Sequence, residues 1–316
     1  MPLSLHRVSP SGASYGWPVE PFDSAHPVRA TLGDPRMVFD DPPTPQTLMS
    51  GAGSFTFHFG VDISAPDGTA AFPVVSGKVT HVESDWIGVD AGGGRTFQYW
   101  HLDAAVTPGQ QVQARTTRLG TIKPDVEHVH LTEISGGKIV NPLAAGHLTP
   151  YADNTDPEVR SISFRTGGSS LLPNFLRGLV EIVAEAYDFP TLPVPGAWQG
   201  MPTAPALVTW RIDDLDGNAV VPETTATDFR TTIPDNSQFW HYYGRGTYQN
   251  FGVFGPHFSW AQPGCYLFAL TRQPLDTRSI SDGVYDIVVT ATDIRGNQGS
   301  RSRRFTVHNR PGWVGS

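Results

Sequence analysis

Four histidines and one aspartate in the first half of the chain have side chains that can hold a metal ion and move protons. His58 and Asp62 are four residues apart, His101 follows, and one residue separates His128 from His130. Zinc takes histidine nitrogen and carboxylate oxygen as ligands in a tetrahedral site, and a catalytic zinc keeps one position for water. Each short spacing is weak evidence by itself, so the elements that carry these residues must be considered.

The interval between His58 and Asp62 requires a bend in the chain. On a straight strand, residues four apart are separated by about 13 Å, which is too far for one metal ion. Gly60 gives the chain freedom to bend between them. His81 and Asp85 have the same spacing, but no glycine separates them and they follow a predicted hairpin strand. We therefore expect His81 and Asp85 to be a solvated surface pair.

The pair His128 and His130 belongs to a predicted strand over residues 128–134. Alternate residues of a strand point to the same face, about 7 Å apart along the chain. One histidine could bind the metal while the other faces the bound water. The alternative is two hydrogen-bonded histidines on a sheet face, and His101, at the end of a predicted strand over residues 96–101, could likewise be an ordinary strand residue.

Further short motifs accompany the histidines in a fixed order. This ordered set resembles the LytM/lysostaphin-type zinc endopeptidases, whose peptidase domain has the duplicated-hybrid-motif fold. The match covers roughly residues 30–145, under half of the chain. The matching segments are Gly33-Asp34-Pro35-Arg36, His58-Phe59-Gly60-Val61-Asp62, Gly68-Thr69, Tyr99-Trp100-His101-Leu102, His128-Val129-His130 and Asn141-Pro142.

The resemblance implies a role for each residue of the set. His58, Asp62 and His130 would be the ligands of one catalytic Zn²⁺, and His101 and His128 would be catalytic histidines that do not bind the metal. Zinc lowers the pKa of bound water and polarises the scissile carbonyl, while the two histidines can transfer protons or stabilise the oxyanion. The sequence does not decide which of the two is the general base.

The resemblance also implies a substrate and a location. We expect a zinc metalloendopeptidase that hydrolyses stem or cross-bridge peptides of peptidoglycan, outside a bacterial cell or in its envelope. Residues 1–22 contain no apolar segment of the signal-peptide kind. The alternatives are a non-catalytic module that binds the cell envelope with the same fold, and a zinc protease that acts on a protein substrate.

Two segments depart from the family pattern. A Gly/Ser/Thr-rich segment usually precedes the His-x-His motif, whereas this chain has Gly120–Glu127 there. The acidic residue after the motif, Glu133, comes one position late. By analogy with the family, we expect both departures on the groove-facing side of the motif, where they would affect substrate preference more than metal binding.

The composition favours a β-rich protein and argues against some functions. Of the 316 residues, 39% are apolar and 16% are charged, with 33 Gly and 28 Pro, which is typical of loop-rich β structure. The net charge of −8, without a Lys/Arg cluster, argues against nucleic-acid binding. No apolar run approaches the roughly 18 residues of a transmembrane helix. The single cysteine, Cys265, excludes an intramolecular disulfide and is expected to be buried in a strand.

We predict an all-β protein of two domains. Residues 1–150 would form the zinc metallopeptidase domain, with a hairpin over Phe72–Val82 that turns at Ser76-Gly77. After a polar linker over Thr149–Ser161, residues 151–316 would form an immunoglobulin-like or fibronectin-type β-sandwich that could bind an envelope partner. Its predicted strands are Gly178–Tyr187, Ala206–Asp213, Gly264–Arg272, Gly283–Asp293 and Arg304–His308, with turns at Gly217-Asn218 and Gly296-Asn297.

Residues 239–260 form an aromatic stretch with nine aromatic side chains, from Phe239 to Trp260. Aromatic faces bind sugars and protein partners, so the stretch could be an exposed recognition surface. We favour a long loop that packs on the sandwich or on the peptidase domain. His241 and His257 could form a second metal site, but no carboxylate pattern supports one.

Overall fold

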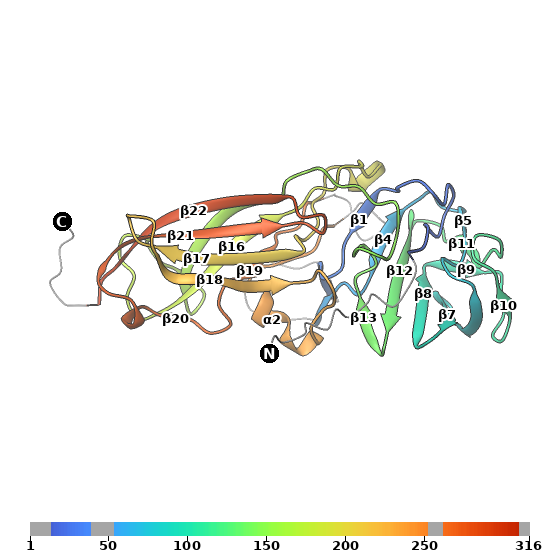
Figure 1. Cartoon of the computed structure of the whole chain (residues 1–316), viewed down its shortest axis with the longest axis horizontal. Coiled ribbons are helices and arrows are strands. Elements are labelled where there is room, and N and C mark those ends of the chain that lie inside the picture. The colour runs from blue at the N-terminus through green and yellow to red at the C-terminus, as the bar shows by residue number, and fades with distance from the viewer. Residues whose placement is uncertain (1–13, 39–53, 252–261, 310–316) are drawn as a thin grey trace, which may run out of the picture.

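The structure is a computed structural model that describes residues 14–38, 54–251 and 262–309. Within these ranges nearly all regular structure is β-strand in antiparallel sheets, so the all-β prediction is confirmed. Figure 1 shows an elongated molecule in which the sheets formed by residues 28–30 and 61–140 lie at one end and those formed by residues 158–307 lie at the other. We refer to them as the N-terminal unit and the C-terminal unit.

The N-terminal unit is built on one large antiparallel sheet with the strand order β1-β4-β12-β8-β7-β6-β10, in which β13 also pairs with β12. A smaller sheet has the order β5-β11-β9. β4 is buried along its whole length and β12 along most of it, so the centre of the large sheet is covered on both faces. The strands are Val28–Ala30 (β1), Val61–Ser64 (β4), Ala70–Ala71 (β5), Gly77–Val82 (β6), Trp86–Gly92 (β7), Arg95–Trp100 (β8), Leu102–Ala104 (β9), Gln111–Val112 (β10), Gly120–Ile122 (β11), His128–Ser135 (β12) and Lys138–Val140 (β13).

The predicted hairpin over Phe72–Val82 is wrong. Residues 72–76 form no strand, and β6, which begins at Gly77, pairs with β7 and β10. The hairpin of this region is β6–β7. Glycine at position 77 serves close packing, because a Cβ atom there would lie 2.3 Å from the carbonyl oxygen of Asp90.

The C-terminal unit consists of two antiparallel sheets that share one hydrophobic core. One has the order β15-β14-β16-β19, with β20 also paired to β16, and the other has the order β18-β17-β21-β22. The strands are Glu158–Thr166 (β14), Ser169–Ser170 (β15), Leu179–Tyr187 (β16), Leu207–Asp213 (β17), Ala219–Asp228 (β18), Leu267–Ala269 (β19), Leu275–Asp276 (β20), Gly283–Thr292 (β21) and Gln298–Val307 (β22). The short helices are Gly196–Trp198 (η1), Asn236–Gln238 (η2), Phe239–Tyr242 (α2) and Thr277–Ser279 (η3).

Most predicted strands of the C-terminal unit are present, but β14 and β18 were not foreseen. β14 begins at Glu158, inside the predicted linker Thr149–Ser161. β18 is exposed along most of its length, so it lacks the apolar alternation that identifies a strand. The predicted strand Gly264–Arg272 shortens to β19, and Arg304–His308 is the end of the longer β22. The immunoglobulin-like assignment and the domain boundary at residue 150 stay predictions.

A two-stranded sheet from the first part of the chain packs into the C-terminal unit. Phe57 belongs to the same core cluster as Phe229 and Phe239, and its ring centroid lies 5.2 Å from that of Phe239. Gly33 permits the close approach, because a Cβ atom there would lie 2.3 Å from the Phe229 ring. The strand that leads into His58 is therefore fixed by the C-terminal unit. The two strands are Pro35–Val38 (β2) and Ser54–Phe57 (β3).

The described part of the aromatic stretch contributes to this core. Phe239 and Tyr243 are fully buried within it, which agrees with the packed loop that we favoured. His241 is exposed. Residues 252–261, and with them His257, lie outside the described residues, so the second metal site stays untested.

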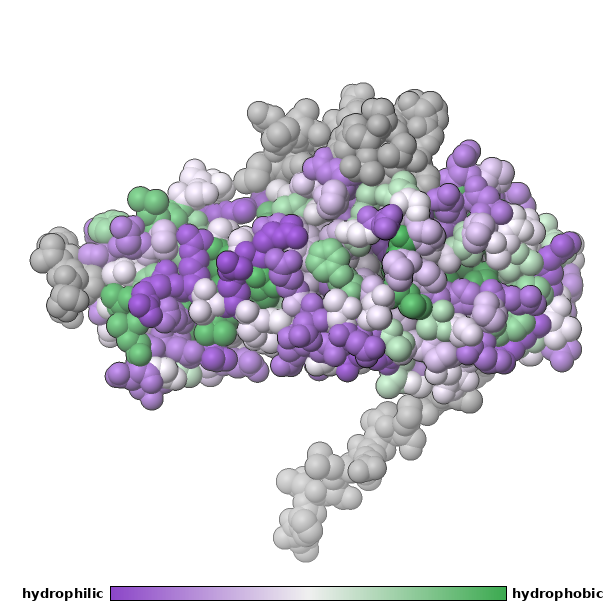
Figure 2. Space-filling model, turned by 90° about the horizontal axis from the view of Figure 1, so that it is seen from above, coloured by the Kyte–Doolittle hydropathy of each residue, from purple (hydrophilic) through white to green (hydrophobic). Residues whose placement is uncertain are grey.

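The surface is mostly polar. Figure 2 shows polar residues over much of one long face, with hydrophobic residues in small separate groups. No helix in the described ranges has the length and apolar character needed to cross a membrane. Cys265 is half-buried and forms no disulfide, and burial raises the pKa of its thiol to about 11.

Candidate metal centre

The pairing of two strands brings Asp62 and His130 face to face. β4 and β12 are antiparallel, with His130 opposite Asp62, which places their Cβ atoms about 5 Å apart on one side of the sheet. His58 precedes β4, and its backbone N–H donates to Asp34 while its carbonyl accepts from Gly33. Two of the candidate ligands are therefore fixed by the sheet, and the third by the segment beside it.

Gly60 is required here for space. Its backbone is not in the left-handed region, and a Cβ atom would lie 2.3 Å from the carbonyl oxygen of Leu131 and 2.7 Å from Nε2 of His130. The segment between His58 and Asp62 thus lies directly against β12. The sequence identified the correct glycine, but the reason is close approach to the neighbouring strand and not conformational freedom.

Three potential ligand atoms converge at this point. Nε2 of His58 lies 3.0 Å from Oδ1 of Asp62 and 2.8 Å from Nδ1 of His130, and that Nδ1 lies 2.9 Å from the same Oδ1. Ligand atoms around a tetrahedral zinc with bonds of about 2.0–2.1 Å are separated by roughly 3.3 Å. The cluster matches this spacing to within a few tenths of an ångström.

The outer atoms of the two imidazoles show why the cluster suits a cation. Nδ1 of His58 lies 2.8 Å from the carbonyl oxygen of Thr31 and must donate to it, which leaves a lone pair on Nε2. Nε2 of His130 lies 2.9 Å from the Thr132 hydroxyl, which can accept its proton and leave a lone pair on Nδ1. Two lone pairs and a carboxylate oxygen then face one another, an arrangement that a metal ion stabilises.

The surroundings of the cluster keep His58 neutral and Asp62 ionised, and these are the protonation states that bind a metal ion. Burial, followed by the nearby charges of Arg36 and His130, lowers the pKa of His58 to about 3. Burial alone would raise the pKa of Asp62, but the surrounding histidines, His58 first, then His128 and His130, hold that pKa well below its usual range. A neutral imidazole beside a carboxylate is the pair of states that binds zinc.

Arg36 holds the second oxygen of Asp62. Its Nη2 donates to Oδ2 at 3.1 Å, while Oδ1 faces His58 and His130. One oxygen of the carboxylate thus binds an arginine, while the other faces the ligand cluster. Arg36 closes the Gly33-Asp34-Pro35-Arg36 motif of the sequence, but its contact with Asp62 could not be read from the motif.

His128 lies on the same face of β12 as His130, next to the ligands. Its Nδ1 donates to the carbonyl oxygen of Val126 at 2.8 Å, so Nε2 carries a lone pair, and Nη2 of Arg29 donates to that atom at 3.2 Å. Burial holds the pKa of His128 well below its ordinary value. His128 is therefore a neutral residue beside the cluster, with Nε2 3.6 Å from Oδ1 of Asp62.

His101 reaches the same place from the end of β8. The strand ends at Trp100, and His101 has a left-handed backbone with φ 68°. Its ring centroid lies 4.6 Å from that of His128. The side chain is about one-third exposed, and burial lowers its pKa. The structure thus brings together all five residues predicted from the sequence.

Asp85 is a residue of this site that sequence reasoning missed. Its Oδ2 lies 3.1 Å from Nδ1 of His101 and its Oδ1 lies 2.9 Å from Nζ of Lys123, and its carbonyl accepts the backbone N–H of His101. The expectation of a solvated His81–Asp85 pair is therefore wrong for Asp85, while His81 is exposed and stacks on Trp86. Asp85 is brought to His101 by the pairing of β7 with β8, and no local sequence pattern predicts that pairing.

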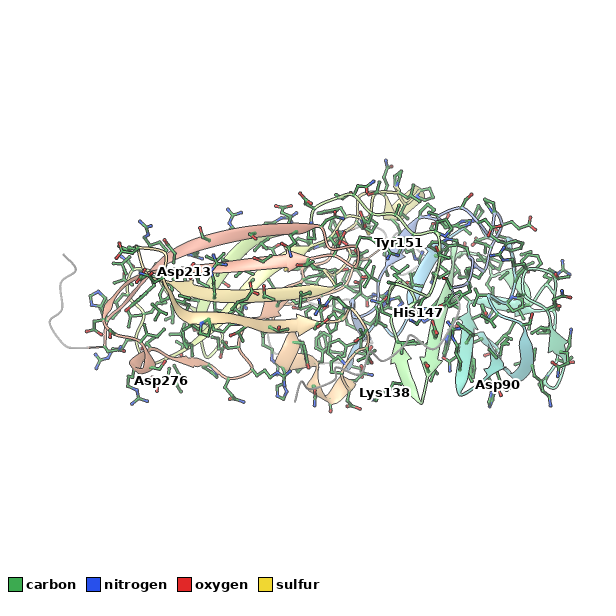
Figure 3. All side chains as sticks on the ribbon, viewed as in Figure 1. Asp90, Lys138, His147, Tyr151, Asp213 and Asp276 are labelled. Carbon is green, nitrogen blue, oxygen red and sulfur yellow. The ribbon has the colours of Figure 1, made fainter. Side chains whose placement is uncertain are left out.

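Glu133 points away from the metal centre, which corrects the expectation that it faces the groove. It is fully buried, and its carboxylate accepts from Arg95 at 2.6 Å and from Tyr15, and lies 2.7 Å from Nδ1 of His147. Figure 3 labels His147 over the strands of the N-terminal unit. Because residues of β12 alternate, Thr132 takes the position beside His130 instead.

A cavity of about 300 Å³ opens beside the ligands. The side chains that line the cavity come from both units. They include Asp62 and the two non-ligand histidines, His101 and His128. From the N-terminal unit it is lined by Arg29, Arg36 and His101, and from the C-terminal unit by Trp198, Gln249 and Asn250. The C-terminal unit therefore forms one wall of the candidate site.

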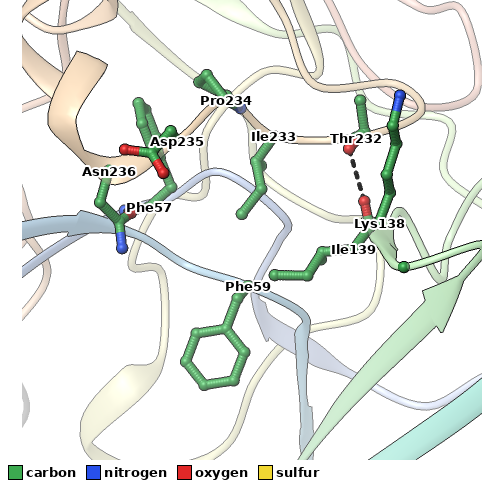
Figure 4. Close-up of a pocket in the computed structure, with 10 residues that line it drawn as sticks. Phe57, Phe59, Lys138, Ile139, Thr232, Ile233, Pro234, Asp235 and Asn236 are labelled. Atoms are coloured by element: carbon green, nitrogen blue, oxygen red, sulfur yellow. Dashed lines mark hydrogen bonds between the residues drawn. The ribbon is translucent and has the colours of Figure 1, made fainter.

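A larger cavity of about 500 Å³ lies on the other side of the β3–β4 connection. Figure 4 shows the segment from Thr232 to Asn236 across the top of the cavity, with Phe57 beside Asn236 and with Phe59 and Ile139 below. Thr232 donates to the carbonyl of Ile139 at 2.6 Å across its edge. None of the predicted ligands or catalytic histidines lines it, but the Phe59 ring lies 4.5 Å from that of His130.

Three buried aspartates also lie together, at the junction of the units: Asp153, Asp188 and Asp293. Two of them close turns. Asp293 accepts the backbone N–H groups of residues 295–297, and Asp153 accepts those of residues 155 and 191. Two of the three carboxylates are thus held by backbone N–H groups.

No protein-family description matches the chain, and neither does any curated protein sequence. Similar solved structures include a zinc-containing peptidase from Vibrio cholerae, with 18% identity over 41% of this chain and 39% of that chain, at a TM-score of 0.32. The catalytic domain of a prophage-encoded M23 protein from Enterococcus faecalis is 23% identical over 35% of this chain and 90% of that chain, at 0.26. The SpoIIQ–SpoIIIAH pore-forming complex is 18% identical over 42% of this chain and 90% of that chain, at 0.31. Similarity at this level carries no functional argument, which must come from the site.

Proposed function

We propose that the chain is a zinc-dependent endopeptidase that hydrolyses peptide bonds in the stem or cross-bridge peptides of peptidoglycan. The observation that carries the proposal is the convergence of Nε2 of His58, Oδ1 of Asp62 and Nδ1 of His130 within 3.0 Å of one another. The peptidoglycan substrate rests on the ordered sequence motifs. The three residues would hold one Zn²⁺ and leave a fourth position for water.

Bound zinc supplies a Lewis acid that lowers the pKa of water and polarises a carbonyl group. Each residue around it has a separate task. Thr31 and Thr132 fix the tautomers of His58 and His130, and Arg36 orients Asp62 so that Oδ1 faces the ligand cluster. Such outer contacts typically change metal affinity or activity by about 10–100-fold.

His101 is the better candidate for the proton-transferring residue. Asp85 accepts the proton on Nδ1, so Nε2 carries the lone pair, and no described residue is seen to hydrogen-bond that atom. A carboxylate in this position makes an imidazole a better base. His101 would take a proton from the attacking water and return it to the leaving amine.

His128 is suited to positioning the charged guanidinium group of Arg29. Its Nε2 accepts from Arg29 at 3.2 Å, so Arg29 and His128 form a polar pair directed at the metal centre. A positive group fixed beside the reacting carbonyl stabilises the charge that develops on its oxygen. The base would therefore be His101 and the charge-stabilising group would be the Arg29–His128 pair.

We also propose a role for the C-terminal unit and a cellular location for the protein. Its two sheets fit an immunoglobulin-like domain that binds an envelope partner, and Leu172, Phe175 and Leu179 are exposed apolar residues on this unit. An extracellular or cell-envelope location in a bacterium follows from the proposed substrate.

The test is zinc content per chain together with release of soluble fragments from purified peptidoglycan. We expect about one zinc per chain and release that a chelator abolishes. Asp62→Asn should lose both, while Asp90→Asn, which changes an exposed aspartate of β7, should retain both.

The alternatives predict other results. One zinc without release from peptidoglycan, but with cleavage in a panel of proteins, would favour a protease of another substrate class. A folded protein that binds no supplied zinc would contradict the enzyme and leave a module that binds the envelope.

A further inference from the structure

Two arginines line the cavity beside the metal centre. Nη2 of Arg36 lies 3.1 Å from Oδ2 of Asp62, and Nε of Arg29 lies 4.0 Å from the same oxygen. Arg29 is held in place, because it donates to the carbonyl of Val126 at 3.0 Å and stacks over the Trp198 ring at 4.3 Å. Both guanidinium groups thus converge on one edge of the ligand cluster.

The lining of this cavity has an excess of positive charge. Asp62 is its one carboxylate among the described lining residues, against the two arginines. Asp34 lies 4.0 Å from Arg36 but is fully buried behind it. Arginine side chains stay protonated in proteins, so both guanidinium groups are charged at neutral pH. Bound zinc would add to the excess.

The lining that the C-terminal unit contributes is neutral and suits the rest of a peptide residue. It consists of the Trp198 indole and the amides of Gln249 and Asn250 from the C-terminal unit. Oε1 of Gln249 accepts the backbone N–H of Met37 at 2.9 Å, so this side chain is fixed. The volume of about 300 Å³ is at the lower end for small-ligand pockets, roughly 300–1,000 Å³.

We infer that this cavity binds a carboxylate of the substrate through Arg36, with the charge of Arg29 beside it, so that the enzyme prefers peptides with a carboxylate next to the scissile bond. Guanidinium groups recognise carboxylates through paired N–H donors. Because Arg36 touches a zinc ligand directly, the carboxylate would lie within about one residue, roughly 3.5 Å of chain, of the carbonyl at the metal. This inference rests on the proposed function and specifies its substrate.

The experiment measures binding of uncleaved peptides to chelator-treated protein by calorimetry or NMR titration. N-acetyl-trialanine is compared as the free acid and as the amide, and a second pair of peptide amides ends in Glu or Gln. We expect the carboxylate to improve affinity by at least tenfold in one pair or both. The pair that responds shows whether the carboxylate is terminal or on a side chain.

Gln249→Glu is the decisive variant because it is isosteric and keeps the acceptor for Met37. It places a negative charge in the cavity without touching a ligand, so the preference should fall below about threefold. Gln298→Glu, on an exposed position of β22, should keep the wild-type preference. Arg36→Gln, with its fold checked by circular dichroism, should also lose the preference.

Equal binding of acid and amide in both pairs would overturn the inference, as would a preference that Gln249→Glu leaves unchanged. Turnover by the zinc-loaded protein separates this result from the proposed function. Cleavage without carboxylate preference overturns the inference alone. Carboxylate-dependent binding without any cleavage supports the cavity as a carboxylate site and contradicts the peptidase.

Discussion

At the scale of single residues, the centre depends on which nitrogen of each imidazole carries a proton. Carbonyl oxygens hold the Nδ1 protons of His58 and His128, and a carboxylate holds that of His101. The proposed base and ligands are therefore distinguished by their neighbours more than by their residue type.

His130→Ala and His128→Ala should separate metal binding from catalysis. His130→Ala removes one of three converging ligand atoms, so we expect bound zinc and activity to fall together. His128→Ala leaves the three ligand atoms in place and should retain most of the zinc while turnover falls by 100-fold or more, the usual scale for such groups. Zinc content by atomic absorption, measured beside peptide cleavage, gives the answer. An empty metal site in His128→Ala would reverse the two assignments.

Asp85→Asn tests whether His101 depends on its carboxylate partner. Zinc content should stay unchanged, because Asp85 contacts no ligand, while kcat should fall by about 10–100-fold. The pH profile is the informative readout: without the carboxylate the imidazole is a weaker base, and the acidic limb of kcat against pH should move to lower pH. Asp103→Asn, at an exposed position of β9, is the control. If kcat falls but the acidic limb of the pH profile stays where it is in the wild type, Asp85 has only a structural role.

At the scale of elements, the motifs selected five residues that the fold brings together, and they predicted the strands that carry most of these residues. They could not predict the strand neighbours, because register across a sheet is set by contacts between segments far apart in sequence. The β4–β12 pairing creates the Asp62–His130 contact, and the β7–β8 pairing brings Asp85 to His101. The predicted hairpin at Ser76-Gly77 was wrong for a similar reason. Glycine is needed at position 77 because the chain packs closely against Asp90 of the neighbouring strand, and not because the chain turns there.

Gly60→Ala tests the close approach of the β3–β4 connection to β12. A Cβ atom would meet backbone at 2.3 Å, so the segment carrying His58 must move, and we expect a loss of more than about 2 kcal/mol of stability with loss of zinc. Gly109→Ala is the control for backbone strain without a steric clash, because φ there is +89° and no atom lies within 4 Å of the added Cβ atom. It should cost about 1 kcal/mol and keep the zinc. Zinc retained by Gly60→Ala would contradict the packing argument.

At the scale of the whole molecule, the two units are joined around the segment that precedes His58. Asp34 is fully buried at this junction. Its carboxylate accepts the N–H of Ala204 at 2.7 Å and the hydroxyl of Thr31 at 3.0 Å, while Tyr243 donates to the neighbouring carbonyl of Gly33. The geometry of the candidate metal centre and the docking of the C-terminal unit therefore depend on the same residues.

Asp34 should make the stability of the whole chain depend on pH. Burial raises its pKa to about 6, against the smaller lowering effect of Arg36 and of its hydrogen bonds. The folded state then holds this proton more tightly than the unfolded state, whose pKa is about 4. The stabilisation is complete below about pH 4, declines as pH rises, and is lost above about pH 6. A rise of about two pKa units corresponds to about 3 kcal/mol.

Asp34→Asn removes this titration and isolates its effect. The free energy of unfolding of the wild type, minus that of Asp34→Asn, should fall by about 2 kcal/mol between pH 4 and pH 7. Urea denaturation in the presence of a chelator measures it without the pH dependence of metal binding. The exposed variant Asp90→Asn should show no such trend. A difference that is constant or rises with pH would mean that Arg36 keeps Asp34 ionised, and that the junction is held by an ion pair across the whole range.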